Sequence, residues 1–200
     1  MTAPHRALAI AASVLASLAA FTGSSHRSAN GTLDVAALAR NIEHEDDHVT
    51  AVELAQWIKD RKPGLRVLDI RSDSEFVAFH IPSAERLPLS ALSAMKPVGG
   101  ETLVLYSEGG AHAAQGWVLL RSLGFSNVYF LRGGLLDWMD DVMSPALAEP
   151  TGNAAADSAR AQRAALSRYF GGVPRVGVVP LPAAQATAAS AVARVRRRGC

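Results

Sequence analysis

The central part of the chain alternates short apolar runs with segments of helical spacing. Three apolar runs, at residues 65–70, 102–106 and 127–131, are bounded by turn or polar residues, which is typical of buried strands. The segments between and after them predict helices at about 74–78, 111–123 and 135–142, with Gly124 as a helix C-cap. Strands that alternate with helices indicate an α/β fold with a mainly parallel sheet flanked by helices.

Two further helices are predicted before the first strand. Residues 32–43 have the spacing of a lead-in helix, and a charged stretch follows at 43–48. Thr50 and Glu53 match a capping box, so the second helix is expected to start at about Ala51.

An apolar, alanine-rich run at residues 7–20 follows a short segment with one positive side chain, Arg6. The run is shorter than the about 20 residues that a spanning helix needs, and it fits the hydrophobic region of a secretory signal. We therefore expect residues 1–23 to direct export to the periplasm or cell envelope, with Ser17-Leu18-Ala19 as the best match to a cleavage site. Retention of this segment as an N-terminal membrane anchor is the alternative, and residues 24–47 then form a tether and the lead-in helix.

The composition changes beyond Met143, so residues 48–143 are expected to form the one folded domain. Residues 144–200 read as a tail rich in Ala, Pro, Gly and Arg, with a helix over 154–170 and a largely disordered stretch from 171. The excess of basic residues is local, in Arg194, Arg196, Arg197 and Arg198, so no nucleic-acid interface is expected. Cys200 is the only cysteine, which excludes an intramolecular disulfide and a cysteine-based metal site.

Three stretches, in a fixed order, carry a resemblance to a known family. The first is L-D-I-R at 68–71 with E-F at 75–76 and H-I-P-S-A at 80–84, the second is L-V-L-Y at 103–106, and the third is F-L-R-G-G at 130–134 with D-W at 137–138. From 48 to about 142 the chain resembles the rhodanese (sulfurtransferase) family. The resemblance implies a rhodanese-like three-layer fold with an active-site loop directly after the strand at 102–106.

The loop that the resemblance implies is made of Ser107, Glu108, Gly109, Gly110, Ala111 and His112. Active members of the family begin it with cysteine, whose thiolate or persulfide is held by backbone N–H groups and the N-terminus of the next helix. A serine hydroxyl cannot form a sulfur–sulfur bond, so the persulfide intermediate is unavailable at Ser107. Glu108 adds a carboxylate and His112 stands where many members have arginine, so we expect weak binding of small anions. Gly109 and Gly110 can take positive φ and aim their amides inward.

These features predict a rhodanese-like protein without classical thiosulfate sulfurtransferase activity. It would act as a binding or accessory module in envelope sulfur or redox processes, with a small ligand or a partner protein at the loop and no cofactor or metal. A loop that only links strand to helix is the competing interpretation. The alternative function is sulfur transfer through the Cys200 thiol, which the nearby arginines should make more acidic and which a flexible tail would bring within reach of the loop.

The polar residues around the loop have structural interpretations as well. Asp69, Arg71 and Glu75 could form a carboxylate pair with an arginine clamp, but we expect an Arg71–Glu75 ion pair that fixes the turn, because i,i+4 charges of this kind are usually structural. Arg132 is a further supporting residue. His80 is expected to hydrogen-bond the turn.

Three other patterns are assigned to structure. Residues 44–48 match H-E-x-x-H, but a new helix starts two residues later, so both imidazoles cannot share one continuous helix face and no metal site is expected. Ser107 lacks the preceding glycine of a nucleophile elbow, since Leu105 stands there, which leaves a serine hydrolase as a minor alternative. Trp57, Trp117 and Trp138 have core spacings.

Overall fold

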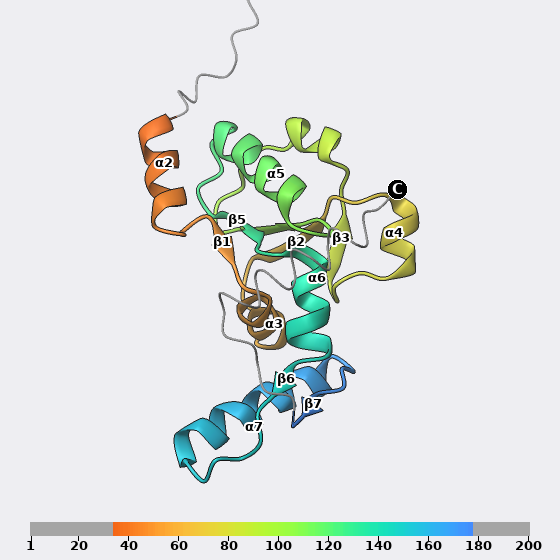
Figure 1. The fold of residues 1–200 in the computed structure, drawn as a ribbon. Helices are drawn as coiled ribbons and strands as arrows, with labels where there is room; N and C mark the ends of the chain where they lie inside the picture. The colour runs from red at the N-terminus through yellow and green to blue at the C-terminus, as the bar shows by residue number, and fades with distance from the viewer. Residues whose placement is uncertain (1–33, 178–200) are drawn as a thin grey trace, which may run out of the picture. The chain divides into compact units, whose positions relative to one another are not determined.

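A five-stranded parallel sheet forms the centre of the fold in the computed structural model, which describes residues 34–177 (Figure 1). The strand order is β1-β5-β4-β2-β3, and every neighbouring pair is parallel. The strands are β1 His48–Val49, β2 Leu65–Asp69, β3 Ala84–Arg86, β4 Thr102–Tyr106 and β5 Val128–Leu131. The expected α/β fold with a mainly parallel sheet is therefore confirmed.

Helices cover both faces of the sheet, and β4 shows why its sequence is apolar throughout. Val104 and Tyr106 pack in the core with α3 (Ala51–Lys59) and α6 (Gly134–Trp138). Leu103 and Leu105 point to the other face, where they pack with α5 (Ala111–Ser122) and η1 (Leu89–Ala94). Successive strand residues face opposite sides, so a strand buried on both faces must be apolar at every position.

Local capping signals set the starts of two helices. Thr50 accepts a hydrogen bond from the Glu53 N–H, and the Glu53 carboxylate accepts one from the Thr50 N–H, which confirms the capping box before α3. Ser72 and Glu75 repeat the arrangement before α4 (Asp73–Ala78). Each box satisfies N–H groups that the first helical turn leaves without partners.

Ordered structure extends further along the chain than the sequence indicated. The helix expected at 135–142 is α6 followed by a π-helical turn, η2 (Met139–Met143), and the one expected at 154–170 is α7 (Ala154–Tyr169). Residues 175–176 form β7 (Arg175–Val176), which pairs in parallel with β6 (Ala146–Leu147). No sequence signal predicted this pairing, because it joins residues almost thirty positions apart.

The lead-in helix is α2 (Val35–Glu43), and it precedes β1. The expected signal or anchor at 1–23, most of the tether and Cys200 lie outside the described residues. Within residues 34–177, no helix has the length and apolar character needed to cross a membrane.

Candidate functional site

The loop that begins with Ser107 lies at the carboxyl edge of the parallel sheet, where β4 ends. Ser107 is buried, and its Oγ accepts a hydrogen bond of 3.1 Å from the Gly110 N–H. Gly110 has a left-handed backbone (φ +86°) and caps α5, so the chain turns directly from the loop into the first turn of the helix. The sequence analysis allowed positive φ at both Gly109 and Gly110; Gly110 adopts it and its N–H binds Ser107, whereas Gly109 does not have positive φ.

The N-terminus of α6 fixes the orientation of the loop peptides. The Leu135 N–H donates to the Ser107 carbonyl at 2.9 Å, and the Leu136 N–H donates to the Glu108 carbonyl at 3.0 Å. In a trans peptide the C=O and the following N–H point in opposite directions. The N–H groups of Glu108 and Gly109 therefore point away from α6, and neither donates a hydrogen bond to another residue of 34–177.

The close approach of α6 depends on glycine. Gly134 has φ +60°, and a Cβ at this position would lie 2.2 Å from the Ser107 carbonyl oxygen and 2.7 Å from that of Glu108. Atoms cannot approach this closely, so a side chain at 134 would push the loop away from α6. Gly133 and Gly134 belong to the F-L-R-G-G stretch at 130–134, but the sequence analysis did not predict that Gly134 lets the loop pack closely against α6.

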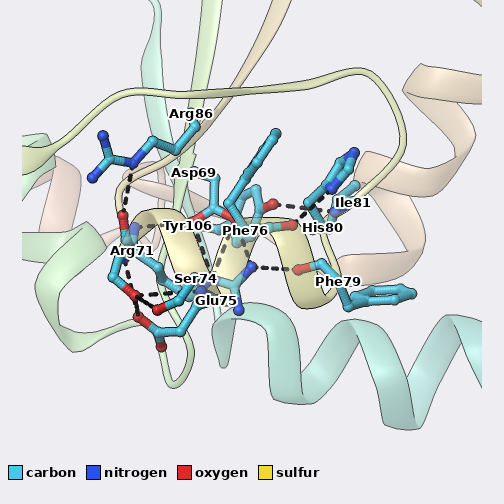
Figure 2. A network of polar contacts seen from close by, with 11 residues as sticks. Asp69, Arg71, Ser74, Glu75, Phe76, Phe79, His80, Ile81, Arg86 and Tyr106 are labelled. Carbon is cyan, nitrogen blue, oxygen red and sulfur yellow. Dashed lines mark hydrogen bonds and ion pairs between the residues drawn. The ribbon is translucent and has the colours of Figure 1, made fainter.

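A buried polar network lies beside the loop at the ends of β2 and β4 (Figure 2). The Asp69 carboxylate accepts hydrogen bonds from the Arg71 side chain, with Nη2–Oδ2 at 2.6 Å and Nε–Oδ1 at 3.0 Å. The Tyr106 hydroxyl lies next to the Asp69 carboxylate and accepts a hydrogen bond from the Ile81 N–H at 3.1 Å. Burial, together with the Asp69 carboxylate, raises the pKa of Tyr106 well above its ordinary value, so the phenol stays neutral.

The prediction of an ion pair between Arg71 and Glu75 is wrong. Arg71 binds Asp69 and the Phe79 carbonyl, whereas the Glu75 carboxylate caps α4 by accepting from the hydroxyl and the N–H of Ser72. These bonds from Ser72, the hydroxyl first, lower the pKa of Glu75. The capping box forms instead because Ser72 and Glu75 are three residues apart at the start of α4, where the helix geometry brings them together.

The other candidate residues do not converge on Ser107. Glu108, His112 and Arg132 are exposed, and the Arg132 N–H donates to the Val49 carbonyl at the end of β1. Within residues 34–177, neither His112 nor His80 forms a hydrogen bond with Ser107. His80 Nδ1 instead lies 2.9 Å from the Phe76 carbonyl, which confirms its predicted role in the turn.

The remaining sequence patterns behave as structural elements. His44 follows the end of α2, and His48 lies in β1 with its Nδ1 2.8 Å from Asp47, so the two imidazoles do not share a helix. Trp117 and Trp138 are fully buried, as expected for core residues. Tyr106 was not predicted as a site residue, because its apolar neighbours in the strand gave no signal for a hydroxyl in a polar network.

Comparison with known proteins supports the family resemblance. The rhodanese-like domain family matches residues 50–141. The chain is 39% identical over 74 residues to an uncharacterized protein of Synechocystis sp., covering 36% of this chain and 41% of that protein. It is 29% identical over 94 residues to the probable adenylyltransferase/sulfurtransferase MoeZ of Mycobacterium tuberculosis, covering 45% and 24% of the two chains. The chain thus spans less than half the length of these relatives.

Two further likenesses cover about half of this chain. The chain is 27% identical over 107 residues to a tRNA uridine(34) hydroxylase of Hamiltonella defensa, covering 50% of this chain and 30% of the relative. Among solved structures, the human single-domain sulfurtransferase TSTD1 is 26% identical and aligns with a TM-score of 0.42, over 46% of this chain and 94% of that one. Residues 50–141, which match the rhodanese-like family, contain strands β2 to β5 and the loop at Ser107.

Proposed function

Because residues 50–141 form a rhodanese-like domain, we propose that the protein is a binding or accessory module in sulfur or redox processes and that its loop forms no persulfide. One observation carries the proposal: the first residue of the loop is Ser107, and its Oγ is held by the Gly110 N–H at 3.1 Å. An oxygen at this position cannot accept sulfur through a sulfur–sulfur bond. The relative named a probable adenylyltransferase/sulfurtransferase supports a role connected with sulfur chemistry.

The loop retains groups suited to a small anion. The N–H groups of Glu108 and Gly109 point away from α6, and the first turn of α5 contributes the positive end of a helix dipole. The exposed Glu108 carboxylate opposes an anion at the same place. A small oxyanion, or an anionic group of a partner protein, is therefore the expected ligand, and its binding is expected to be weak.

A transfer assay from thiosulfate to cyanide tests the absence of persulfide chemistry. We expect no activity in the full chain or in Cys200→Ser, and a gain of activity in Ser107→Cys, because the Gly110 N–H and the α5 N-terminus would stabilise a thiolate there. Ser126→Cys places a thiol on an exposed loop without such a cradle and is the matched control. Both new thiols are compared in the Cys200→Ser background.

The alternative functions predict different results. Activity of the full chain that disappears in Cys200→Ser would contradict the proposal and support a sulfur carrier that uses the Cys200 thiol. Ester hydrolysis that disappears in Ser107→Ala would support a serine hydrolase.

We also propose export to the cell envelope through the apolar run at 7–20, which cell fractionation tests by comparing the full chain with a variant that lacks residues 1–23.

A further inference from the structure

Helix α2 has an apolar face that the fold leaves uncovered. Val35, Leu38 and Ile42 are spaced by three and four residues, which places them on one side of the helix. Leu38 packs partly against the core, but 66% of Val35 and 52% of Ile42 is exposed, and no residue of α2 is buried. A helix of nine residues is too short to be stable alone in water, so further packing against this face would stabilise α2.

Negative charge without ion-pair partners surrounds the end of this face. Glu43, Glu45 and Asp46 are exposed, and within residues 34–177 none of them pairs with a basic side chain. All 18 acidic residues of the chain lie in 34–177, whereas six of its 20 basic residues lie outside, so the described part has a net charge of −4. A segment that binds this surface should therefore carry both basic and apolar side chains.

We propose that residues 191–198 of the same chain, A-V-A-R-V-R-R-R, bind this surface. Val192 and Val195 would lie on the apolar face of α2, and the arginines would pair with the carboxylates. The 17 residues that follow Gly177, up to Arg194, can span up to about 58 Å when extended. This exceeds the diameter of a domain of this length, whose radius of gyration is about 15 Å.

This docking has a consequence for the site at Ser107. The carboxylates after α2 lie just before β1, at the amino edge of the parallel sheet, while Ser107 follows β4 at the carboxyl edge. Docking of residues 191–198 would therefore hold Cys200 at the opposite edge from the loop. The inference complements the proposed function, since a docked tail keeps the single thiol of the chain away from the anion-binding loop.

A nitroxide attached to Cys200 of the ¹⁵N-labelled full chain tests the docking, because no other thiol competes for the label. We expect the amide signals of residues 35–46 to lose more than half their intensity and to recover when the label is reduced. The loss should also disappear in 1 M salt, where the Debye length is about 3 Å, and when the four arginines at 194 and 196–198 are replaced by serine. The measurement does not depend on sulfur transfer, so it can fail independently of the proposed function.

Matched variants and a mixing experiment complete the test. Asp46→Lys should restore much of the lost intensity, whereas Asp140→Lys, also an exposed acid, should leave the loss unchanged. The inference is overturned if the loss falls on residues 107–112, if it is absent from 35–46, or if Asp140→Lys acts as strongly as Asp46→Lys. In the mixing experiment, ¹⁵N-labelled chains without nitroxide are combined with nitroxide-labelled chains that carry no ¹⁵N. The same loss in this mixture would overturn the inference too, because the occupant would then be a second copy.

Discussion

Tyr106 and Asp69 are register partners at the carboxyl ends of adjacent strands, and the Tyr106 hydroxyl lies next to the Asp69 carboxylate. The same hydroxyl accepts the Ile81 N–H, so one phenol joins β4, β2 and the turn before β3. Since Tyr106 directly precedes Ser107, this bond also fixes the start of the loop.

Removing that hydroxyl should destabilise the fold. Tyr106→Phe leaves the buried Ile81 N–H without its acceptor, so we expect a loss of about 1–3 kcal/mol in the free energy of unfolding, measured by urea denaturation. Tyr129→Phe is the control, because the Tyr129 side chain is only partly buried and its hydroxyl has no hydrogen-bond partner within residues 34–177. Equal losses in the two variants would contradict a structural role for the Tyr106 hydroxyl.

Removing the Asp69 carboxylate charge should cost more. Asp69→Asn leaves the Arg71 guanidinium, whose side chain is only 7% exposed, without its anionic partner. Breaking a buried ion pair from one side costs about 3–5 kcal/mol. Glu85→Gln, which breaks the more exposed pair with Arg66, should cost less than about 1 kcal/mol in the same urea experiment. A small effect of Asp69→Asn would show that Arg71 finds another partner.

Gly134 should be essential for the position of the loop. Gly134→Ala places a Cβ within 2.2 Å of the Ser107 carbonyl, whereas Gly100→Ala meets no atom within 4 Å although its φ of +84° is also left-handed. Gly100→Ala should therefore cost only the backbone penalty of about 1–2 kcal/mol. Gly134→Ala should cost more and also shift the backbone amide signals of residues 107–112. Equal stability and unshifted loop signals in Gly134→Ala would refute the close approach of α6.

Glu108 should weaken anion binding at the loop. Glu108→Gln removes a negative charge beside the N–H groups, so the Kd for thiosulfate should fall by up to about fivefold, equivalent to about 1 kcal/mol. Chemical-shift titration of the loop amides measures this change, and the difference should shrink in high salt. Glu43→Gln, at the opposite edge of the sheet, should leave the affinity unchanged. If Glu108→Gln binds no more tightly than the unmodified chain, the anion does not bind beside residue 108.

The capping boxes should make stability depend on pH in the acid range. Thr50, through its N–H first and then its hydroxyl, lowers the pKa of Glu53, and Ser72 lowers that of Glu75. Because both pKa values are lower in the folded state, this stability is present above the unfolded pKa of about 4.3 and is lost as pH falls through the folded values.

The Glu53→Gln/Glu75→Gln variant isolates that contribution. At pH 7 it should be less stable by no more than about 1 kcal/mol, because Glu53 is exposed and Glu75 is only partly buried. The difference from the unmodified chain should vanish as the carboxylates become protonated below their folded pKa values. Urea denaturation at several pH values measures it, and a difference that stays constant into the acid range would contradict the proposed linkage.

Signals carried by neighbouring residues determined much of the fold from sequence alone. The apolar runs specified β2, β4 and β5, because a strand buried on both faces requires apolar side chains at every position. The Thr50–Glu53 pair located the start of α3, since its hydrogen bonds span only three residues. The residue at the start of the loop, Ser107, was likewise readable without a structure.

Contacts between distant parts of the chain were decided only by the tertiary structure. Arg71 pairs with Asp69 rather than Glu75 because Ser72 engages Glu75, and Asp69 is buried where β2 meets β4. The loop amides are oriented by α6, which begins 27 residues after Ser107 and approaches it through Gly134. Sequence spacing fixes hydrogen bonds within a turn of helix, but the partner of a buried polar group depends on which strands and helices pack against it.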